Sequence, residues 1–215
     1  MIAIVDYGMG NLRSAQKGLE KAGYQAVITD DPKAIDRADA VVLPGVGAFK
    51  DCYDGLRSRG LAEPVKAAAL SGRPFLGICV GLQLLFEGSE EGPCDEGLGV
   101  FPGRVVRFQS RDETGLKVPH MGWNQVEPVP GRPCPLLKSW ESPGYAYFVH
   151  SYYAQPSDES LVLATCDYGR KFPAIVGRDN LFAVQFHPEK SQTGGIALLR
   201  AFGSLVDARM AGESS

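Results

Sequence analysis

Apolar and polar residues follow two patterns along the chain, and the change falls near residue 100. Before it, short and nearly continuous apolar runs alternate with longer stretches in which apolar residues recur every three or four positions. Continuous runs are typical of strands buried on both faces, and the longer stretches are typical of amphipathic helices. The predicted strands are 2–6, 25–29, 40–43 and 75–78. This alternation predicts a parallel sheet with helices on both faces.

After residue 100 the apolar segments are short, alternating or aromatic, which indicates antiparallel strands that extend or flank the sheet. They are 100–108, 118–126, 145–153, 161–165 and 181–186. A last amphipathic helix is expected over 194–209, and residues 211–215 are expected to fray. We therefore expect one α/β domain over residues 1–210, with an open, mostly parallel twisted sheet and additional antiparallel strands.

Composition narrows the class of protein. The 215 residues carry a net charge of -3, so no basic surface for nucleic acid is indicated. No apolar stretch is long enough to span a membrane, and the N-terminus lacks the features of a signal peptide. The five cysteines are odd in number and include no C-x-x-C pair, which argues against a disulfide framework or a zinc site. A reducing, cytoplasmic location is expected.

The sequence from Pro74 to Phe86 is typical of a buried strand, a sharp turn and a helix from Gly81. The turn holds Gly77-x-Cys79-x-Gly81, the cysteine form of the nucleophile elbow. Such a turn crowds its flanks, so the positions two before and two after the nucleophile must lack side chains. Cys79 would lie at a helix N-terminus, whose dipole favours a thiolate. By itself, the motif also fits a buried structural cysteine between two turn glycines.

A nucleophilic cysteine needs a base, and the chain has three histidines. His187 precedes Pro188, which disfavours the α conformation at position 187. In an extended segment Glu189 would lie on the same side as His187 and could fix its tautomer. His120 and His150 have aromatic neighbours, and we expect hydrogen-bonded structural or binding roles for them. The pattern predicts a Cys-His-Glu triad.

Gly8, Gly45 and Cys79 each follow a predicted parallel strand. Their turns therefore share the carboxyl edge of the sheet, where active groups of α/β proteins gather. Glycines on both sides of Val46 would let backbone amides approach a ligand or reorient. The Gly8-x-Gly10 pair does not extend to a dinucleotide-binding motif, because the third glycine position is Arg13.

With these motifs the chain resembles the class I (triad) glutamine amidotransferases, whose hallmarks are a G-x-C-x-G elbow and a late His-Pro-Glu. Within that class it looks most like the glutaminase subunits of imidazole glycerol phosphate synthases. The matching stretches span nearly the whole chain and are 6–12, 43–49, 77–86, 118–124, 147–152 and 185–191. The resemblance implies a flavodoxin-like α/β fold and hydrolysis of L-glutamine without a metal or an organic cofactor.

The resemblance also implies roles for individual residues. Cys79 would be the nucleophile, His187 the acid and base, and Glu189 its orienter. The oxyanion hole would combine the Val80 N–H with an N–H of the loop at Val46 or Gly47. The residues implied to hold glutamine are Gly45, Gln83, Ser151 and Tyr152. Those implied to face a partner are Asn11, Met121, Trp123, Tyr147 and Lys190.

Ammonia released into water becomes ammonium, a poor nucleophile, so it must be handed on under cover. One domain of this size leaves no room for a second active site, so a separate acceptor-bearing chain is expected. The resemblance identifies it as a (β/α)8-barrel cyclase subunit, in a heterodimer that makes imidazole glycerol phosphate and an aminoimidazole carboxamide ribotide in histidine biosynthesis. If the loop at Gly45–Gly47 rests with a carbonyl toward the thioester site, the free subunit would be nearly idle until its partner binds.

Three alternatives remain open at this point. The chain could be the glutaminase subunit of another ammonia-using synthase, such as pyridoxal phosphate synthase. It could be a non-catalytic subunit that only binds a partner. It could also be a cysteine hydrolase or a chaperone-like protein with an elbow in a similar sheet, although such a protein would not require the late His-Pro-Glu or the Pro-Gly-Val-Gly loop.

Overall fold

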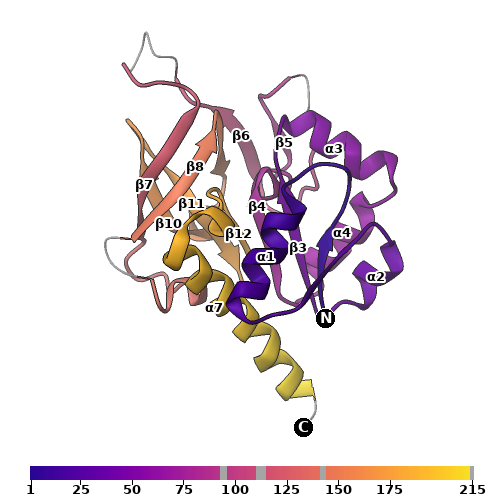
Figure 1. Ribbon diagram of the computed structural model, residues 1–215. Coiled ribbons are helices and arrows are strands. Elements are labelled where there is room, and N and C mark those ends of the chain that lie inside the picture. The colour runs from indigo at the N-terminus through magenta and orange to yellow at the C-terminus, as the bar shows by residue number, and fades with distance from the viewer. Residues whose placement is uncertain (93–95, 110–114, 141–143, 214–215) are drawn as a thin grey trace.

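A nine-stranded mixed sheet forms the centre of the protein in the computed structural model, which describes residues 1–92, 96–109, 115–140 and 144–213 (Figure 1). The strand order is β2-β1-β3-β4-β12-β11-β10-β7-β8. The first five strands of this order are parallel, and the last four continue the sheet with antiparallel pairings. A second sheet has the order β5-β6-β9. The fold is therefore an open, mixed α/β sheet with added antiparallel strands, as the sequence predicts.

The parallel strands are β1 (Ile2–Val5), β2 (Ala26–Thr29), β3 (Ala40–Gly45), β4 (Phe75–Cys79) and β12 (Leu181–Val184). The antiparallel strands of the large sheet are β7 (His120–Pro128), β8 (Gly144–His150), β10 (Val162–Asp167) and β11 (Lys171–Arg178). The small sheet consists of β5 (Gly88–Ser89), β6 (Gly103–Arg107) and β9 (Tyr152–Pro156). Every residue of β1, β3, β4 and β12 is buried, which explains their continuous apolar sequences.

The helices form two groups. Helix α1 (Leu12–Ala22) packs against α7 (Gln192–Glu213). Helix α4 (Ala62–Leu70) contacts α2 (Pro32–Arg37) and α3 (Phe49–Ser58). In the strand order, the chain moves from β1 to β2 in one direction and then back past β1 to β3 and β4 in the other. Because such crossovers are right-handed, this reversal places α1 on one face of the sheet and α2, α3 and α4 on the opposite face. The remaining elements of the described residues are a short helix α5 (Val80–Gln83) and the 3-10 turns η1 (Pro135–Leu137), η2 (Glu159–Leu161) and η3 (Pro188–Lys190).

Several predicted elements differ from the structure. The segment 181–186 is predicted to be an antiparallel strand; β12 does pair antiparallel with β11, but on its other side it pairs parallel with β4. The elbow helix ends at Gln83 and does not reach Phe86, because Leu85 and Phe86 continue in tighter turns. The helix expected to end at Arg209 continues to Glu213, since Ala, Arg and Met extend it without a proline. Residues 211–213 of the expected frayed tail are thus helical, and 214–215 lie outside the described residues, as does Cys94.

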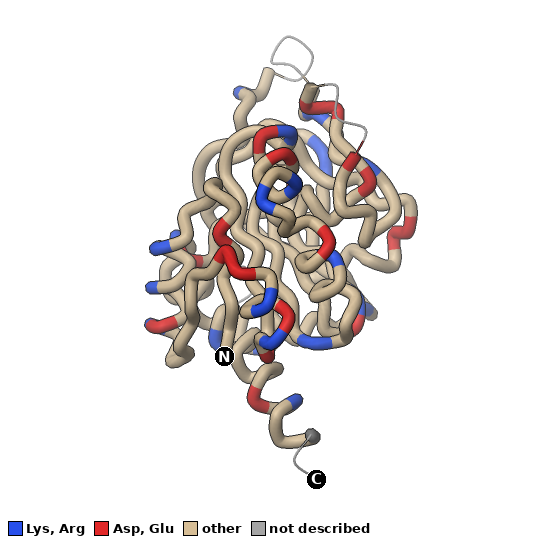
Figure 2. The backbone as a smooth tube through the Cα atoms, turned by 90° about the vertical axis from the view of Figure 1, so that its right-hand side faces the viewer, with Lys and Arg blue, Asp and Glu red and all other residues tan. Residues whose placement is uncertain are grey.

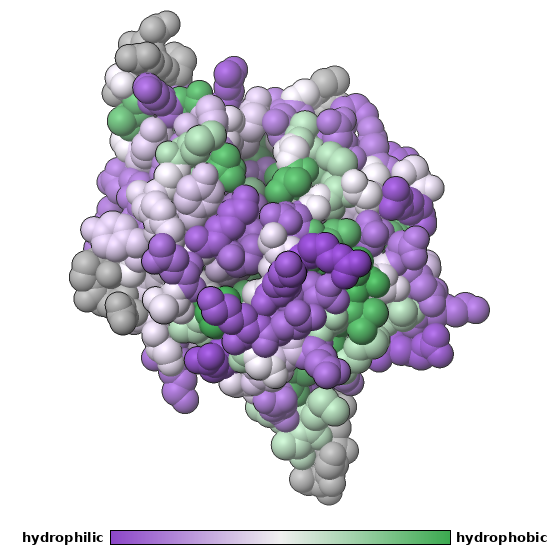
Figure 3. Space-filling model, viewed as in Figure 1, coloured by the Kyte–Doolittle hydropathy of each residue, from purple (hydrophilic) through white to green (hydrophobic). Residues whose placement is uncertain are grey.

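Charged residues of both signs are distributed along the described chain rather than collected in blocks (Figure 2). On the face of Figure 1, polar side chains cover most of the surface, and apolar ones occur in separate small groups (Figure 3). Among the described residues, no helix has both the length and the apolar character needed to cross a membrane. The same part of the chain contains no cluster of three His, Cys, Asp or Glu side chains placed to hold a metal ion.

Candidate active site

Cys79 occupies a strained turn between β4 and α5. Its backbone has φ 57° and ψ -111°, a conformation that non-glycine residues rarely adopt. The flanking glycines are required by close contacts. A Cβ at Gly77 would lie 2.9 Å from the Gly81 carbonyl oxygen, and a Cβ at Gly81 would collide with the Leu43 carbonyl. The sequence thus folds here into the elbow that its G-x-C-x-G motif predicts.

The parallel pairing of β12 with β4 brings His187 to the same edge as Cys79. Ile78 and Val184 are register partners, so the chain leaves both strands at the same level. Cys79 and His187 line one cavity of about 310 Å³, together with residues of the loop after β3 and of the β8–β9 turn. His187 Nε2 is buried and has no partner at regular hydrogen-bond geometry among the described residues. This nitrogen is therefore available to the sulfur and to a substrate.

Glu189 orients the imidazole from behind. Its Oε1 lies 2.9 Å from His187 Nδ1, and both side chains are almost completely buried. His187 is extended, as Pro188 dictates, with φ -100° and ψ 98°. The segment Pro188–Lys190 is a 3-10 turn, however, and not the extended segment expected from the sequence. The carboxylate reaches the ring because the turn curls back under His187.

The charge state of His187 depends on these two neighbours. Burial alone would lower its pKa, but the interactions of the ring with Cys79 and Glu189 and the charges of both groups outweigh burial and raise the pKa to about 10. The imidazole therefore holds its proton at neutral pH. A protonated His187 next to Cys79 is suited to deliver a proton to a leaving group.

The Val80 N–H begins α5 and has no partner within its own helix, so it is free to bind an oxyanion. Two side chains hold the loop after β3 by donating hydrogen bonds to its carbonyl groups. The Tyr7 hydroxyl donates to the Pro44 carbonyl at 2.7 Å, and the Cys52 thiol donates to the Val46 carbonyl at 3.4 Å. Because successive carbonyls of a strand alternate in direction, the Gly45 carbonyl between them points toward β4. Because the C=O and N–H of a trans peptide point in opposite directions, we expect the Val46 N–H to point away from β4.

The residues expected to hold glutamine do not all reach the cavity. Gln83, Ser151 and Tyr152 line it, and so do Val46 and Gly47. Gly45 does not, because it packs beneath the elbow, where a Cβ would lie 2.7 Å from the Gly81 nitrogen. Its lack of a side chain serves the close approach of β3 to the turn.

Two polar residues at the site were missed by the sequence reasoning. Glu91 lines the cavity, and its carboxylate accepts the Phe49 N–H at 2.8 Å. Gln185 is fully buried, and its Nε2 lies 3.9 Å from the Cys79 sulfur. Glu91 stands in an acidic loop with no motif, whereas Gln185 lies two residues before His187. Side-chain alternation along that strand was the one available signal for Gln185.

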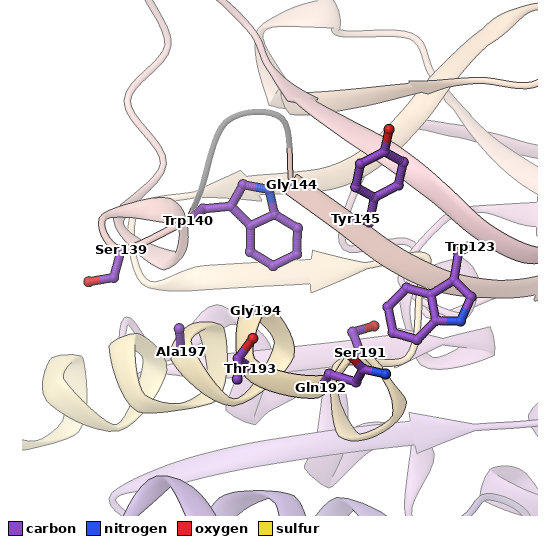
Figure 4. A pocket seen from close by; sticks show the side chains of 10 residues that line it. All are labelled: Trp123, Ser139, Trp140, Gly144, Tyr145, Ser191, Gln192, Thr193, Gly194 and Ala197. Carbon is purple, nitrogen blue, oxygen red and sulfur yellow. The ribbon is translucent and has the colours of Figure 1, made fainter.

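A second cavity, of about 480 Å³, lies between β7, β8 and the start of α7. Figure 4 shows Trp123 and Tyr145 on one side of it, Trp140 on another, and Thr193 and Gln192 on the helix below. None of the residues lining it is a cysteine, a histidine or a carboxylate. Its polar side chains are the hydroxyls of Ser139, Tyr145, Ser191 and Thr193, the Gln192 amide and two indole rings.

Four of the five predicted partner-facing residues gather near β7 and β8. Met121 and Trp123 project from β7 with 62% and 47% of their surface exposed. Tyr147 is the register partner of Trp123, with ring centroids 6.2 Å apart. Lys190 Nζ lies 5.8 Å from the centre of the Tyr147 ring. Asn11 precedes α1 and borders a narrow space shared with Glu189 and His187.

Sequence comparison places these residues in a known context. Residues 3–203 match the family model described as glutamine amidotransferase class-I. The chain is 57% identical over 209 residues to the imidazole glycerol phosphate synthase subunit HisH of Syntrophotalea carbinolica, with 95% of this chain and 100% of the relative covered. It is 53% identical over 207 residues to the subunit of the same name from Geobacter sulfurreducens, with 95% and 98% covered.

Solved structures support the fold. One described as a glutamine amidotransferase aligns with a TM-score of 0.70 at 23% identity, covering 96% of this chain and 100% of that one. The structure of PurLQS from Thermotoga maritima includes a chain that aligns with a TM-score of 0.71 at 21% identity, covering 97% and 98%. At these identities the likeness concerns the fold alone.

Proposed function

Since the chain belongs to the class I glutamine amidotransferase family, among the HisH subunits of imidazole glycerol phosphate synthase, we propose that its cavity at Cys79 hydrolyses L-glutamine. The products are glutamate and ammonia. The observation that carries the proposal is the buried His187–Glu189 pair beside a cysteine in a nucleophile elbow. A non-catalytic subunit would have no need for the backbone strain at Cys79 or for the buried carboxylate.

The first half of the reaction acylates Cys79. The sulfur attacks the side-chain carboxamide carbon of glutamine, and the carbonyl oxygen becomes an oxyanion held by the Val80 N–H and a loop N–H. Each such donor contributes about 2.7–4 kcal/mol in other acyl-transfer enzymes. His187, protonated at neutral pH, gives its proton to the departing nitrogen as the carbon–nitrogen bond breaks, which releases ammonia and leaves a γ-glutamyl thioester.

The second half hydrolyses the thioester. The acylated sulfur carries no negative charge, so His187 loses one of the interactions that raise its pKa and can accept a proton from water. Hydroxide adds to the thioester carbon, the carbon–sulfur bond breaks, and glutamate leaves. Glu189 keeps the imidazole in one orientation through both steps.

The cavity also offers groups for the amino-acid end of glutamine. The Glu91 carboxylate suits the α-ammonium group, because it is the acidic side chain that lines this cavity. The Ser151–Tyr152 backbone and Gln83 stand on the other side and can hold the α-carboxylate and the side chain. These contacts would place the carboxamide over Cys79.

Ammonia from this site requires a protected acceptor, and we assign that acceptor to a cyclase subunit that forms a heterodimer with this chain. The proposed contact surface is Met121, Trp123, Tyr147 and Lys190, extended by Asn11 toward the triad. Two exposed large apolar side chains next to each other on one strand are typical of an interface. The joint product would be imidazole glycerol phosphate together with aminoimidazole carboxamide ribotide, in the cytoplasm.

Glutamine hydrolysis with the cyclase subunit and its ribotide ligand present tests the proposal. The wild-type complex should release glutamate and ammonia, and a glutamine analogue with an electrophilic side chain should label Cys79. The variant Cys79→Ala should abolish both hydrolysis and labelling while the complex still forms. Turnover by Cys79→Ala, or labelling at another cysteine, would contradict the assignment.

A further inference from the structure

A chain of hydrogen bonds runs from the glutamine cavity to strand β7. His150 Nδ1 lies 2.8 Å from the Tyr152 carbonyl oxygen, and His150 Nε2 lies 3.1 Å from His120 Nδ1. His120 Nε2 lies 3.2 Å from Asn124 Nδ2, which also donates to the Asp167 carbonyl at 2.8 Å. Each of the two imidazoles therefore uses both of its nitrogens within the chain.

The Tyr152 carbonyl at one end decides which partner donates in each of these hydrogen bonds. A carbonyl can only accept, so His150 carries its proton on Nδ1 and presents Nε2 as an acceptor. His120 must then donate through Nδ1, and its Nε2 must accept from Asn124. Asn124 has two amide hydrogens, one for His120 and one for Asp167. All donors and acceptors are satisfied when both histidines are neutral and both carry the proton on Nδ1.

The Tyr152 carbonyl also decides which groups donate in the hydrogen bonds that lead to Cys79. Tyr152 also accepts from Gln83 Nε2 at 2.9 Å, and that nitrogen lies 3.3 Å from Gln185 Oε1. Gln185 therefore turns its Nε2 toward the Cys79 sulfur. The Tyr152 carbonyl is thus the common acceptor between the nucleophile and the histidine pair.

The pair is enclosed by aromatic rings. His120 stacks on Tyr168 at 4.1 Å and on Phe148 at 4.9 Å between ring centroids, and His150 lies 5.2 Å from Phe108. Only 3% and 6% of the surfaces of His120 and His150 are exposed. Burial lowers the pKa of His120 to about 4 and that of His150 to about 3. Both rings therefore stay neutral at physiological pH, as the bond directions require.

The outer end of the chain lies on the strand that carries the proposed partner surface. Along β7, His120 and Asn124 alternate with Met121 and Trp123, which are exposed. A displacement of β7 by a partner would move Asn124 and His120 with the strand. The hydrogen bonds would transmit that displacement to the Tyr152 carbonyl.

We propose that Asn124, His120 and His150 are positioning residues that fix the Tyr152 carbonyl for glutamine binding and connect it to strand β7. The proposal rests on the proposed glutaminase function. It assigns no proton transfer to the histidines, because each hydrogen bond of the chain has one fixed donor and one fixed acceptor.

The tautomers give a direct test. Imidazole nitrogen NMR of ¹⁵N-histidine-labelled protein near neutral pH should show His120 and His150 as neutral rings protonated on Nδ1, with His187 distinct from both. In Asn124→Asp a carboxylate replaces the donor to His120 Nε2, so His120 should become doubly protonated. Finding either histidine protonated on Nε2 alone in the wild-type protein would overturn the proposal.

Kinetics of the complex with the cyclase subunit supply the second test. Asn124→Asp keeps a contact with His120 but cannot donate to the Asp167 carbonyl. Loss of this one hydrogen bond should raise the KM for glutamine about tenfold, with kcat changed less than threefold. Asn180→Asp is the matched control, because it makes the same substitution at an amide that donates to the Gly72 carbonyl before β12 and does not line the cavity. It should leave KM unchanged. An unchanged KM in Asn124→Asp, or an equal rise in both variants, would overturn the positioning role. A wild-type complex without glutaminase activity would instead overturn the proposed function, while the tautomer test would remain valid.

Discussion

The Glu189 carboxylate lies 2.9 Å from His187 Nδ1 at a place where both side chains are almost fully excluded from solvent. A buried carboxylate without a partner would be strongly unfavourable, so this pair is stable only while His187 supplies a donor. The same bond fixes which ring nitrogen faces the cavity. Glu189 therefore fixes the orientation of the imidazole and, together with Cys79, raises its pKa, although Glu189 does not itself line the cavity.

Replacement of Glu189 by Gln should separate these effects from substrate binding. A neutral amide can donate to Nδ1 and stabilise the wrong tautomer, and it removes a charge that raises the pKa of His187. We expect kcat for glutamine to fall by about 10²–10⁴-fold with little change in KM. Glu127→Gln, at an exposed carboxylate paired with Lys171, is the matched control. A fall of kcat below threefold in Glu189→Gln would contradict an orienting role.

The elbow makes a prediction about stability. Gly81→Ala places a methyl group against the Leu43 carbonyl, which is backbone and cannot move aside. We expect a loss of about 1–3 kcal/mol in the free energy of unfolding, measured by urea denaturation, together with a loss of activity. Gly212→Ala, in the last turn of α7 with nothing near the new methyl group, should be neutral or stabilising. Equal stability of the two variants would show that the elbow tolerates a side chain.

The elbow and the triad could be predicted because their signals are local. Glycines two positions either side of Cys79, and a proline after His187, specify backbone geometry within a few residues. Helix α2 also had a local signal that was not recognised: Asp31 caps it by accepting the Lys33 N–H, and Pro32 begins it. Strand β11 was missed because Pro173 and Gly177 weaken a strand pattern, although they fit within this one.

The rest of the site depends on contacts between distant segments. The direction of β12 is decided by its pairing with β4, about a hundred residues earlier, and no pattern within 181–186 encodes it. Glu91 reaches the cavity from the segment after β5, and its bond with the Phe49 N–H joins that segment to the start of α3. The link between His150 and His120 likewise appears only when β7 and β8 pair in register.

The three histidines predict how stability varies with pH. His120 and His150 have pKa values lowered to about 4 and 3 by burial, whereas the unfolded chain binds protons there near 6.5. Unfolding therefore takes up protons below pH 6.5, and stability should fall by up to about 1.4 kcal/mol per pH unit for each histidine. His187, with its pKa raised to about 10, binds its proton more tightly in the folded state, so stability should also fall from pH 6.5 toward 10.

Urea denaturation at intervals between pH 5 and 9 measures this profile. Most carboxylates remain ionised over that range, so the acid limb reports the histidines. The maximum is expected near pH 6.5. A free energy of unfolding that stays constant from pH 5 to 6.5 would contradict the neutral, buried state of His120 and His150.

The exposed Trp123 side chain should be an anchor of the partner interface. Its neighbours Met121 and Tyr147 would surround it in the complex, an arrangement in which one aromatic residue carries much of the binding energy. Trp123→Ala should weaken binding of the cyclase subunit by about thirtyfold, the equivalent of about 2 kcal/mol, as measured by titration calorimetry. Leu70→Ala removes a comparably exposed apolar side chain at the end of α4 and should leave affinity unchanged.

The loop after β3 predicts that activity depends on the partner. Tyr7 and Cys52 hold the carbonyls of Pro44 and Val46. The Gly45–Val46 peptide between them therefore directs its carbonyl, and not its N–H, toward β4. The Val46 N–H is therefore not directed at the oxyanion site in this conformation, and rotation of the Gly45–Val46 peptide would supply it as the loop donor. Because removal of one such donor costs about 10²–10³-fold in kcat, the isolated chain should hydrolyse glutamine at least about 100-fold more slowly than its complex with the cyclase subunit and ribotide ligand. Steady-state release of glutamate, compared between the two and corrected with the Cys79→Ala complex, measures the ratio. Equal turnover by the isolated chain would mean that the Val80 N–H alone suffices and that the loop has no gating role.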